Sequence, residues 1–303
     1  MPKFLRALLF ALLLSFSTAP VHAENPAGKP ATKEEAMAYF RQQAAKLHPQ
    51  HGKVTLQEGL ASLNLSSDFG YLSQDQTEIL VHDIWQNPPV SKTLGSIIPT
   101  SLDVLSPDFW AIIITYNDDG HVSDEDAEKI DYDKLLQQMK DANVEEKKRR
   151  EEDGYQAFDL LGWATSPHYD KAAHKLYWAT KLQPVGQTEM GLNYNIRILG
   201  RKGYLVMTIV GGMQQLPMIE SNIDKILSLV DFNTSQRYAD FNPGTDKMAA
   251  YGMAALIGGT LAAKAGLFKG LLVALIALKK FVILAFVAVV AFFKKLFGRK
   301  KSN

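Results

Sequence analysis

Four consecutive segments with strand-like alternation of side chains constrain the fold more than any other feature of this sequence. They are residues 157–164 (AFDLLGWA), 174–182 (HKLYWATKL), 191–199 (GLNYNIRIL) and 203–211 (GYLVMTIVG). The segment Gly200–Gly203 (GRKG) is typical of a hairpin turn between the last two. The run therefore predicts an antiparallel meander.

The rest of the central region alternates helix and strand signals. Thr32 followed by Glu35, and Ser73 followed by Gln76, are capping boxes that predict helices reaching to about residues 47 and 85. Short strands are expected at residues 53–56, 61–65 and 109–116, and an amphipathic helix at 217–232. The predicted class is α+β, an antiparallel sheet with packed helices.

The acidic stretch from residue 114 to 136 (ITYNDDGHVSDEDAEKIDYDKLL) resembles a metal site at first sight. As a calcium loop counted from Asn117, however, it has His121 at the fifth position and Val122 at the sixth, where a glycine is needed. Ser123 followed by Asp126 instead fits a helix start, because acidic residues stabilise the first turn of a helix. We therefore predict a helix capped by Ser123.

Composition excludes several classes of chemistry. The 303 residues include no cysteine, so disulfides, thiolate metal sites and cysteine nucleophiles cannot form. The formal net charge is only +1, which gives no overall attraction to nucleic acid. The sequence has no G-x-S-x-G, no phosphate-binding glycine-rich loop and no H-E-x-x-H pattern, and we expect no cofactor.

Both ends of the chain carry membrane signals. Residues 1–23 combine two basic residues, a short apolar run and small residues at 21–23, which indicates a secretory signal peptide. An uncleaved anchor is the alternative, although the apolar run is short for a membrane span. Residues 24–245 are then expected to form one domain outside the cytoplasm.

Residues 246–303 read as a membrane anchor. The uncharged stretch 281–293 extends to 297 as a short span if its flanking lysines reach the interface, and the tail contributes Lys294, Lys295, Arg299, Lys300 and Lys301 on the cytoplasmic side. Residues 248–268 are a possible second span. A small residue occurs there at every fourth position, which would form a helix-packing ridge of Ala254, Gly258, Ala262, Gly266 and Gly270.

Aromatic residues on neighbouring predicted strands form the best candidate for a binding surface. Trp163, Trp178 and Tyr194, with Tyr177 and Arg197 nearby, could contact a ligand or partner, although core packing between strands explains the same pattern. His168, Asp170 and His174 could in principle bind a metal, but we favour a polar loop between strands and predict no metal site.

Several segments resemble one family. The stretches IWQNPP (84–89), FWAIIITYNDDGHVSDEDAEKID (109–131), GWATSPHYDKAAHKLYWATKL (162–182), LNYNIRILGRKGYL (192–205) and YADFNPGTDKMAAYGMAAL (238–256) are similar to an uncharacterised family of bacterial membrane-anchored proteins, domain of unknown function 2167. The resemblance implies a bacterial membrane protein and assigns no activity. The order of the elements is also similar in layout to the Mog1/PsbP-like α+β sandwich.

The leading hypothesis is a non-enzymatic envelope protein of the cytoplasmic membrane. Its main domain would face the periplasm or exterior, and it would act through protein contacts or through self-association of its helices in the bilayer. The alternative is a domain that binds a small molecule or peptide on the aromatic surface. A hydrolase using carboxylates such as Asp159, Asp170 or Asp240 is the third hypothesis.

Overall fold

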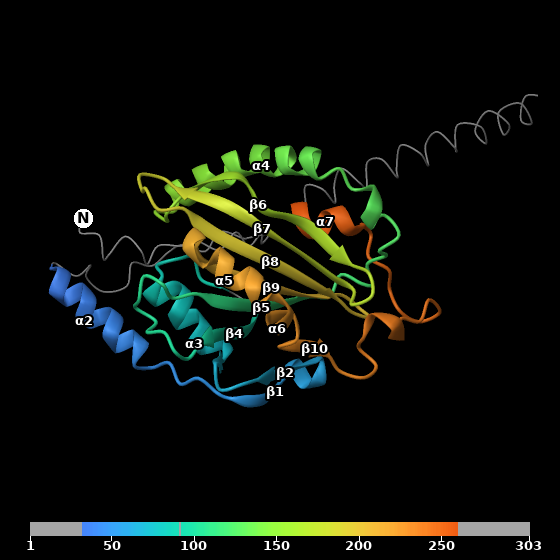
Figure 1. The fold of residues 1–303 in the computed structure, drawn as a ribbon, viewed down its shortest axis with the longest axis horizontal. Coiled ribbons are helices and arrows are strands. Elements are labelled where there is room, and N and C mark those ends of the chain that lie inside the picture. Colours follow the sequence, from blue (N-terminus) through green and yellow to red (C-terminus); the bar gives the residue numbers. More distant parts are fainter. Residues whose placement is uncertain (1–31, 91, 260–303) are drawn as a thin grey trace, which may run out of the picture.

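The computed structural model describes residues 32–90 and 92–259, which form an α+β fold around a seven-stranded antiparallel sheet (Figure 1). The strand order is β3–β4–β5–β9–β8–β7–β6. The strands are β3 Phe69–Leu72, β4 Thr93–Pro99, β5 Ala111–Asn117, β6 Phe158–Asp170, β7 Lys175–Pro184, β8 Gly191–Leu199 and β9 Tyr204–Gly212. The predicted meander is confirmed as β6 to β9.

One face of this sheet is covered by a second, three-stranded antiparallel sheet and two short helices. The smaller sheet has the order β1–β2–β10. These elements are β1 Gly52–Leu56, β2 Ala61–Leu65, β10 Val230–Phe232, α5 Leu216–Ser221 and α6 Ile223–Leu227. Leu63 of β2 and Ile196 of β8 are both fully buried in the core between the two layers. We call this covering the three-stranded layer.

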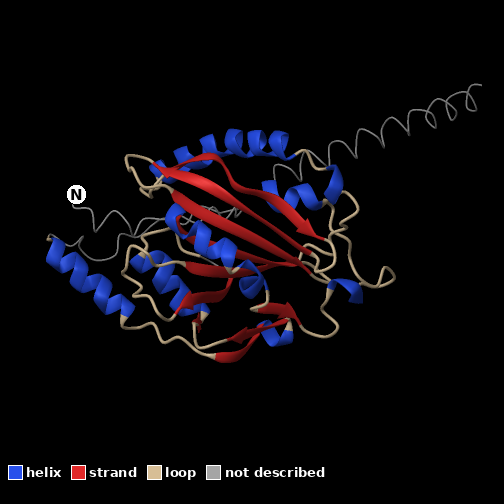
Figure 2. Ribbon diagram, in the orientation of Figure 1, coloured by secondary structure: helices blue, strands red, loops and turns tan. Residues whose placement is uncertain are grey.

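Helices cover the opposite face, so that helices lie on both sides of the sheet (Figure 2). They are α3 Gln74–Glu78, which continues as the π-helix η2 Ile79–Ile84, α4 Tyr132–Glu152 and α7 Met253–Gly258. The helix α2, Lys33–Ala44, packs against η2. Ile84 and Ile113 of β5 belong to one buried apolar cluster, while Leu135 of α4, Leu256 of α7 and Trp178 belong to another.

Both predicted capping boxes are confirmed. The Thr32 hydroxyl accepts a hydrogen bond from the Glu35 backbone N–H at 3.1 Å, and the Ser73 hydroxyl accepts one from the Gln76 backbone N–H at 3.4 Å. These contacts satisfy N–H groups that a helix start leaves unpaired. The remaining helical turns are the short 3₁₀ segments η1 Gln57–Gly59, η3 Ala127–Lys129, η4 Met213–Gln215 and η5 Tyr238–Asp240.

Two predicted helices are wrong in their extent. Residues 217–232 do not form one helix, because Asn222 leaves helical geometry between α5 and α6 and Val230–Phe232 pairs with β2 instead. The helix predicted from Ser123 begins only at Tyr132, where the Asp131 carboxylate accepts the backbone N–H of Lys134 at 3.0 Å. The Ser123 hydroxyl contacts the N–H of Glu125 at 3.4 Å in a local turn.

The folded unit also extends past residue 245, the predicted domain end. Residues 246–259 pack on the sheet, and Met253 in α7 is fully buried. Residues 248–259 of the possible second span therefore belong to the domain. No helix within residues 32–90 and 92–259 is long and apolar enough to cross a membrane. The signal peptide, the 281–297 span and the basic tail lie outside the described residues.

Candidate functional site: a clasp on the C-terminal strap

The acidic loop of residues 117–126, which follows β5, holds the C-terminal strap of residues 238–259. Their backbones run side by side in parallel: His121 N–H donates to the Lys247 carbonyl at 2.9 Å, and Ala249 N–H donates to the His121 carbonyl at 2.8 Å. Gly120 permits this approach, because a Cβ built there would lie 2.7 Å from the Lys247 carbonyl oxygen. We call the contact between loop and strap the clasp.

Three carboxylates of the acidic loop accept hydrogen bonds from the strap. Asp119 accepts the Tyr251 hydroxyl at 2.6 Å, and Asp124 accepts the Tyr238 hydroxyl at 3.2 Å. Asp126 accepts the backbone N–H of Met253 at 3.1 Å, at the start of α7. The acidic residues that suggested a metal loop or helix start therefore fix another part of the chain.

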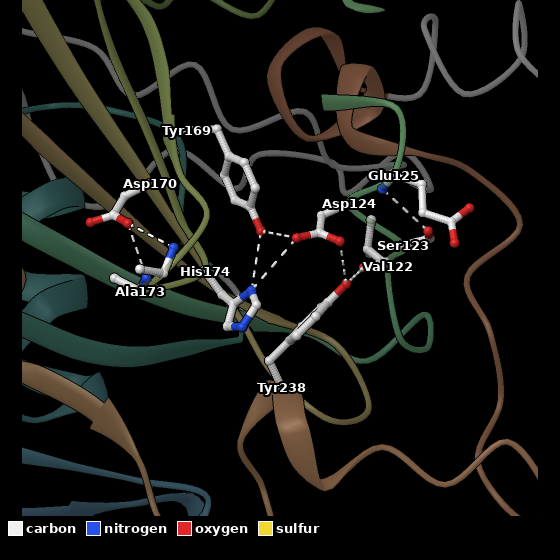
Figure 3. Close-up of polar contacts among 10 residues, drawn as sticks. Val122, Ser123, Asp124, Glu125, Tyr169, Asp170, Ala173, His174 and Tyr238 are labelled. Carbon is white, nitrogen blue, oxygen red and sulfur yellow. Dashed lines mark hydrogen bonds and ion pairs between the residues drawn. The ribbon is translucent and has the colours of Figure 1, made fainter. Parts of the chain in front are cut away.

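Asp124 is the centre of the most connected polar cluster in the clasp (Figure 3). Its carboxylate also accepts the Tyr169 hydroxyl at 2.7 Å and lies 3.7 Å from Nδ1 of His174. Tyr169 and His174 flank the β6–β7 turn, so the cluster joins that turn, the acidic loop and the strap. Burial alone would raise the Asp124 pKa, but hydrogen bonds from Tyr169 and Tyr238 and the nearby His174 outweigh it and lower the pKa.

Aromatic rings form a stack beside these hydrogen bonds. The His121 ring stacks on Phe241 at 4.0 Å and lies 4.3 Å from the Tyr238 ring, whose other neighbour is His174 at 4.1 Å. His121 is 6% exposed, and its Nδ1 has no hydrogen-bond partner among the described residues. Burial lowers the pKa of His121, against smaller opposing effects of backbone groups and nearby acids. The neutral imidazole is thus the form that fits the clasp.

Two arginines fasten the strap to β8 and the turn after it. Arg201 binds Asp246 through two contacts, Nε–Oδ2 at 2.7 Å and Nη2–Oδ1 at 3.1 Å, and this pairing lowers the Asp246 pKa to about 2. Arg197 donates from Nε to the Leu256 carbonyl of α7 at 3.2 Å and lies over the Trp178 ring at 4.8 Å. Burial lowers the pKa of Arg197 to about 10.

The geometry of the cluster fits the attachment of three chain segments to one another. The imidazole of His174 is oriented by Asp124 and Tyr169, as a general base would be, and its polar contacts within the described residues are with those two side chains. No serine or threonine hydroxyl among them contacts its imidazole. Asp124, moreover, has its oxygens occupied by two tyrosine hydroxyls. The cluster therefore serves to hold three chain segments together.

The structure does not bring the aromatic candidates into one surface. Trp178 and Tyr194 are each 1% exposed and lie on opposite faces of the sheet, because paired strands alternate their side chains. Trp163 and Arg197 lie on the Trp178 face, whereas Tyr177 packs with Tyr194 against the three-stranded layer. The sequence pattern revealed strand pairing but not the face to which each ring points.

The candidate carboxylates are also apart and locally engaged. Asp159 pairs with Lys147 at 2.7 Å at one end of β6, whereas Asp170, at the other end, accepts the N–H groups of Ala172 and Ala173. Asp240 accepts the backbone N–H of Arg237 at 2.9 Å. His168 packs on the Tyr177 ring. Within residues 32–90 and 92–259, no three histidine or acidic side chains are arranged to hold a metal ion.

Only the first part of the predicted helix-packing ridge falls within the described residues. Ala254 and Gly258 lie one turn apart on α7 and are half-buried, while Met253, Leu256 and Ile257 point into the core. The helix ends at Gly258, and the C-cap residue Gly259 has φ of +68°. Ala262, Gly266 and Gly270 lie outside the described residues.

Sequence reasoning missed most residues of the clasp, including His121, Asp124, Tyr238, Asp246 and Tyr251. The Tyr238 contact to Asp124 joins residues 114 positions apart, and the Met253 contact to Asp126 spans 127. A helix cap or turn has a fixed short spacing, whereas these pairs have none. The sequence does show a high density of polar and aromatic residues in both segments. That density does not indicate which residue of one segment contacts which residue of the other.

Comparisons with known proteins place the chain in a family without an assigned activity. No curated protein matches it. Its fold is similar to cyanobacterial PsbP (CyanoP) from Synechocystis, with 8% identity, a TM-score of 0.34 and coverage of 61% of this chain and 94% of that one. It is also similar to a mutant of the protein Mog1, with 10% identity, a TM-score of 0.31 and coverage of 61% and 98%. These similarities are too low to support an inference about function.

The family comparison covers far more of the sequence than any single motif. It spans the three-stranded layer, the meander, the acidic loop and the strap, and continues into the residues that follow α7. The model of the family described as protein of unknown function (DUF2167) matches residues 48–290, and the chain therefore belongs to this family.

Proposed function

We propose that this protein is a bacterial envelope protein whose domain lies outside the cytoplasmic membrane and is held there by its C-terminal segment. The observation that carries the proposal is the docking of the strap, which precedes the apolar stretch 281–297 in the sequence. Its backbone pairs with the acidic loop and α7 is buried against the sheet. A domain joined in this way would move with its anchor.

The exposed apolar side chains of the domain favour contact with a protein partner. Four exposed large apolar side chains lie on or beside α4, β6 and the β7–β8 connection: Val144, Leu161, Val185 and Met190. Val144 is 64% exposed and Leu161 is 44% exposed. The residues that precede them are hydrogen-bonded to each other, since the Asn143 side-chain oxygen accepts the Leu160 N–H. Exposed apolar side chains that gather in one region mark interaction surfaces. We propose that this α4–β6 side binds a protein partner.

Reporter fusions test the membrane arrangement. We expect an enzyme that is active only outside the cytoplasm to be active when fused after Gly259 and inactive when fused after Asn303. A single span at 281–297, with the basic tail inside, gives this result. An inactive reporter after Gly259 would place the domain in the cytoplasm and contradict the proposal.

Site-specific photo-crosslinking in intact membranes tests the contact surface. A photoreactive residue at Val144 is expected to give discrete cross-linked bands, because this position lies on the proposed surface. The matched control is Glu152, an exposed residue at the C-terminal end of the same helix. Equal labelling patterns at the two positions would show that the α4–β6 side has no preferred partner.

A further inference from the structure

The edges of the two sheets differ in how they are protected from pairing with a further strand. At β3, the backbones of Gln50 and Tyr71 exchange two hydrogen bonds of 2.8 Å, so the chain itself covers this edge. The edge strand β6 has register shifts at three places, and such irregularities hinder further pairing. At β10, the outward carbonyl of Phe232 accepts a hydrogen bond from Nε of Arg237 at 3.4 Å. These three edges are therefore blocked.

The remaining edge, β1, is open. The strand lies at the outer rim of the molecule (Figure 1), and Lys53 and Thr55 are exposed. Apart from the pairing of β1 with β2, no hydrogen bond joins the backbone of Lys53 or Thr55 to another residue of the described ranges. Proteins usually cover such an edge, because its free N–H and C=O groups can pair with another strand. An open edge beside three blocked ones is therefore a candidate contact surface.

The register shows which backbone groups of β1 point outward. Asn64 N–H donates to the carbonyl of the residue that precedes β10 at 3.0 Å, so the backbone groups of Asn64 face β10. Successive residues of an antiparallel strand direct these groups to opposite sides. Leu63 therefore faces β1, where it pairs with Val54. Lys53 and Thr55, on either side of Val54, direct their N–H and C=O groups away from β2.

The outward groups of β1 are compatible with a second copy of the same strand. In an antiparallel pair centred on Val54, Lys53 of each copy forms a hydrogen-bonded pair with Thr55 of the other. A register centred on Lys53 would place two lysines directly opposite each other, which is destabilising. A register centred on Thr55 would need Gln57, whose φ of +38° departs from strand geometry. The pair centred on Val54 is therefore the symmetric arrangement that the strand allows.

We propose that β1 is a self-association surface, through which two copies of this chain pair in antiparallel fashion and join their three-stranded layers into one sheet. The same surface is used on both copies, so the assembly closes as a dimer. Val54, which is half-buried against the core, meets its counterpart across the twofold axis. The surface lies on the opposite face of the large sheet from α4, and it is independent of the α4–β6 side and of the proposed membrane attachment.

Cysteine trapping tests the proposal, because the chain has no cysteine of its own. The full-length Val54→Cys variant is oxidised with copper phenanthroline in a lysate that retains the membranes. It should shift to twice the monomer mass on a non-reducing gel, since the Cα atoms of the central pair would lie about 4.5 Å apart, within the range of a disulfide. Asn64→Cys, at an exposed position of β2, is the matched control and should remain monomeric.

Thr55→Pro, added to Val54→Cys, tests the backbone pairing itself. Proline removes an N–H that points away from β2, and edge strands tolerate proline at such positions. The melting temperature should stay unchanged while the disulfide dimer is lost, whereas Thr55→Val, which keeps the N–H, should retain the dimer.

Three outcomes would overturn the proposal. They are a yield of dimer for Val54→Cys no higher than for Asn64→Cys, a higher yield for Lys53→Cys than for Val54→Cys, and cross-linking that persists in a folded Thr55→Pro variant. If the proline variant does not fold, the comparison of the three cysteine variants decides alone.

Discussion

The three-stranded layer and the C-terminal strap are both attached to the seven-stranded sheet, but by different physical means. The three-stranded layer is held by apolar packing, with Leu63, Val230 and Phe232 buried against the sheet. The strap buries part of α7 as well, yet its register is set by directed contacts to the acidic loop. One attachment depends on buried area and the other on hydrogen-bond geometry and protonation.

This difference determines which perturbations should weaken the attachment of each region. Apolar packing is non-directional and is insensitive to pH. Hydrogen bonds to carboxylates and a buried neutral histidine depend on protonation state and on the exact approach of two backbones. The three-stranded layer should therefore behave as part of the global core, and the strap as a unit that can open locally.

The largest effect is expected in the apolar region. Leu63→Ala should lower the free energy of unfolding of the full-length protein by about 3 kcal/mol, because it leaves a cavity in a fully buried site. Denaturant unfolding followed by circular dichroism measures it. Leu63→Met, which conserves volume, should cost less than about 1.5 kcal/mol. A loss below 1 kcal/mol for the alanine variant would mean that this layer is loosely packed.

Gly120→Ala should open the strap selectively. The residue has φ of +122°, and an added Cβ would lie 2.7 Å from the Lys247 carbonyl oxygen. We expect a loss of about 2 kcal/mol, measured as faster amide hydrogen exchange in residues 247–257 with β1 and β2 unchanged. Gly154→Ala is the matched control, because Gly154 has positive φ but no neighbour within 4 Å. Equal exchange of residues 247–257 in the two variants would show that the close approach at Gly120 does not hold the strap.

Two substitutions separate the helix cap from the acidic loop. Asp131→Ala should destabilise the protein by about 1 kcal/mol, since it removes the N-cap of α4. Ser123→Ala should change stability by less than about 0.5 kcal/mol, because its hydroxyl makes only a long local contact. Thermal unfolding of both variants under one condition shows which of the two loses more stability. The reverse order would restore Ser123 as the start of the helix.

The smallest effect is a pH dependence confined to the strap. Burial holds the His121 pKa below its ordinary 6.5. When the strap is undocked, His121 therefore takes up a proton more readily as pH falls below 6.5, and acid favours release. Above pH 6.5, the contribution of His121 to the stability of the docked strap is fully present. Asp124, whose pKa is lowered, adds stability above 3.8 that is lost only at more acidic pH. The backbone groups of Gly200 and Arg201 and the carboxylates of Asp124 and Asp246 oppose part of the shift of the His121 pKa.

Hydrogen exchange between pH 8 and 5, corrected for the intrinsic pH dependence of exchange, measures this release. Residues 247–257 should lose protection as pH falls while β1 and β2 do not. His121→Phe keeps an aromatic ring beside Phe241 and should remove the pH dependence. If the variant retains it, another group controls the strap.

Local chemistry explains why parts of the fold could be predicted. The meander β6 to β9 follows from side-chain alternation, and the caps at Thr32 and Ser73 follow from contacts three residues apart. The strands β3, β4 and β10 were missed, because they are short or buried without clear alternation. Val230–Phe232 continued an apparently helical pattern, but pairing with β2 buries Val230 and Phe232.

The sequence by itself determined the α+β class, the meander and two helix starts, because these depend on spacings within a few residues. Tertiary structure decided the roles of the acidic loop, the strap and the aromatic side chains. Asp124 takes part in the clasp because the fold brings Tyr238, 114 residues away, beside it. Trp178 and Tyr194 became core residues because strand pairing directs them to opposite faces. Such contacts depend on where the whole chain lies in space, which no short pattern contains.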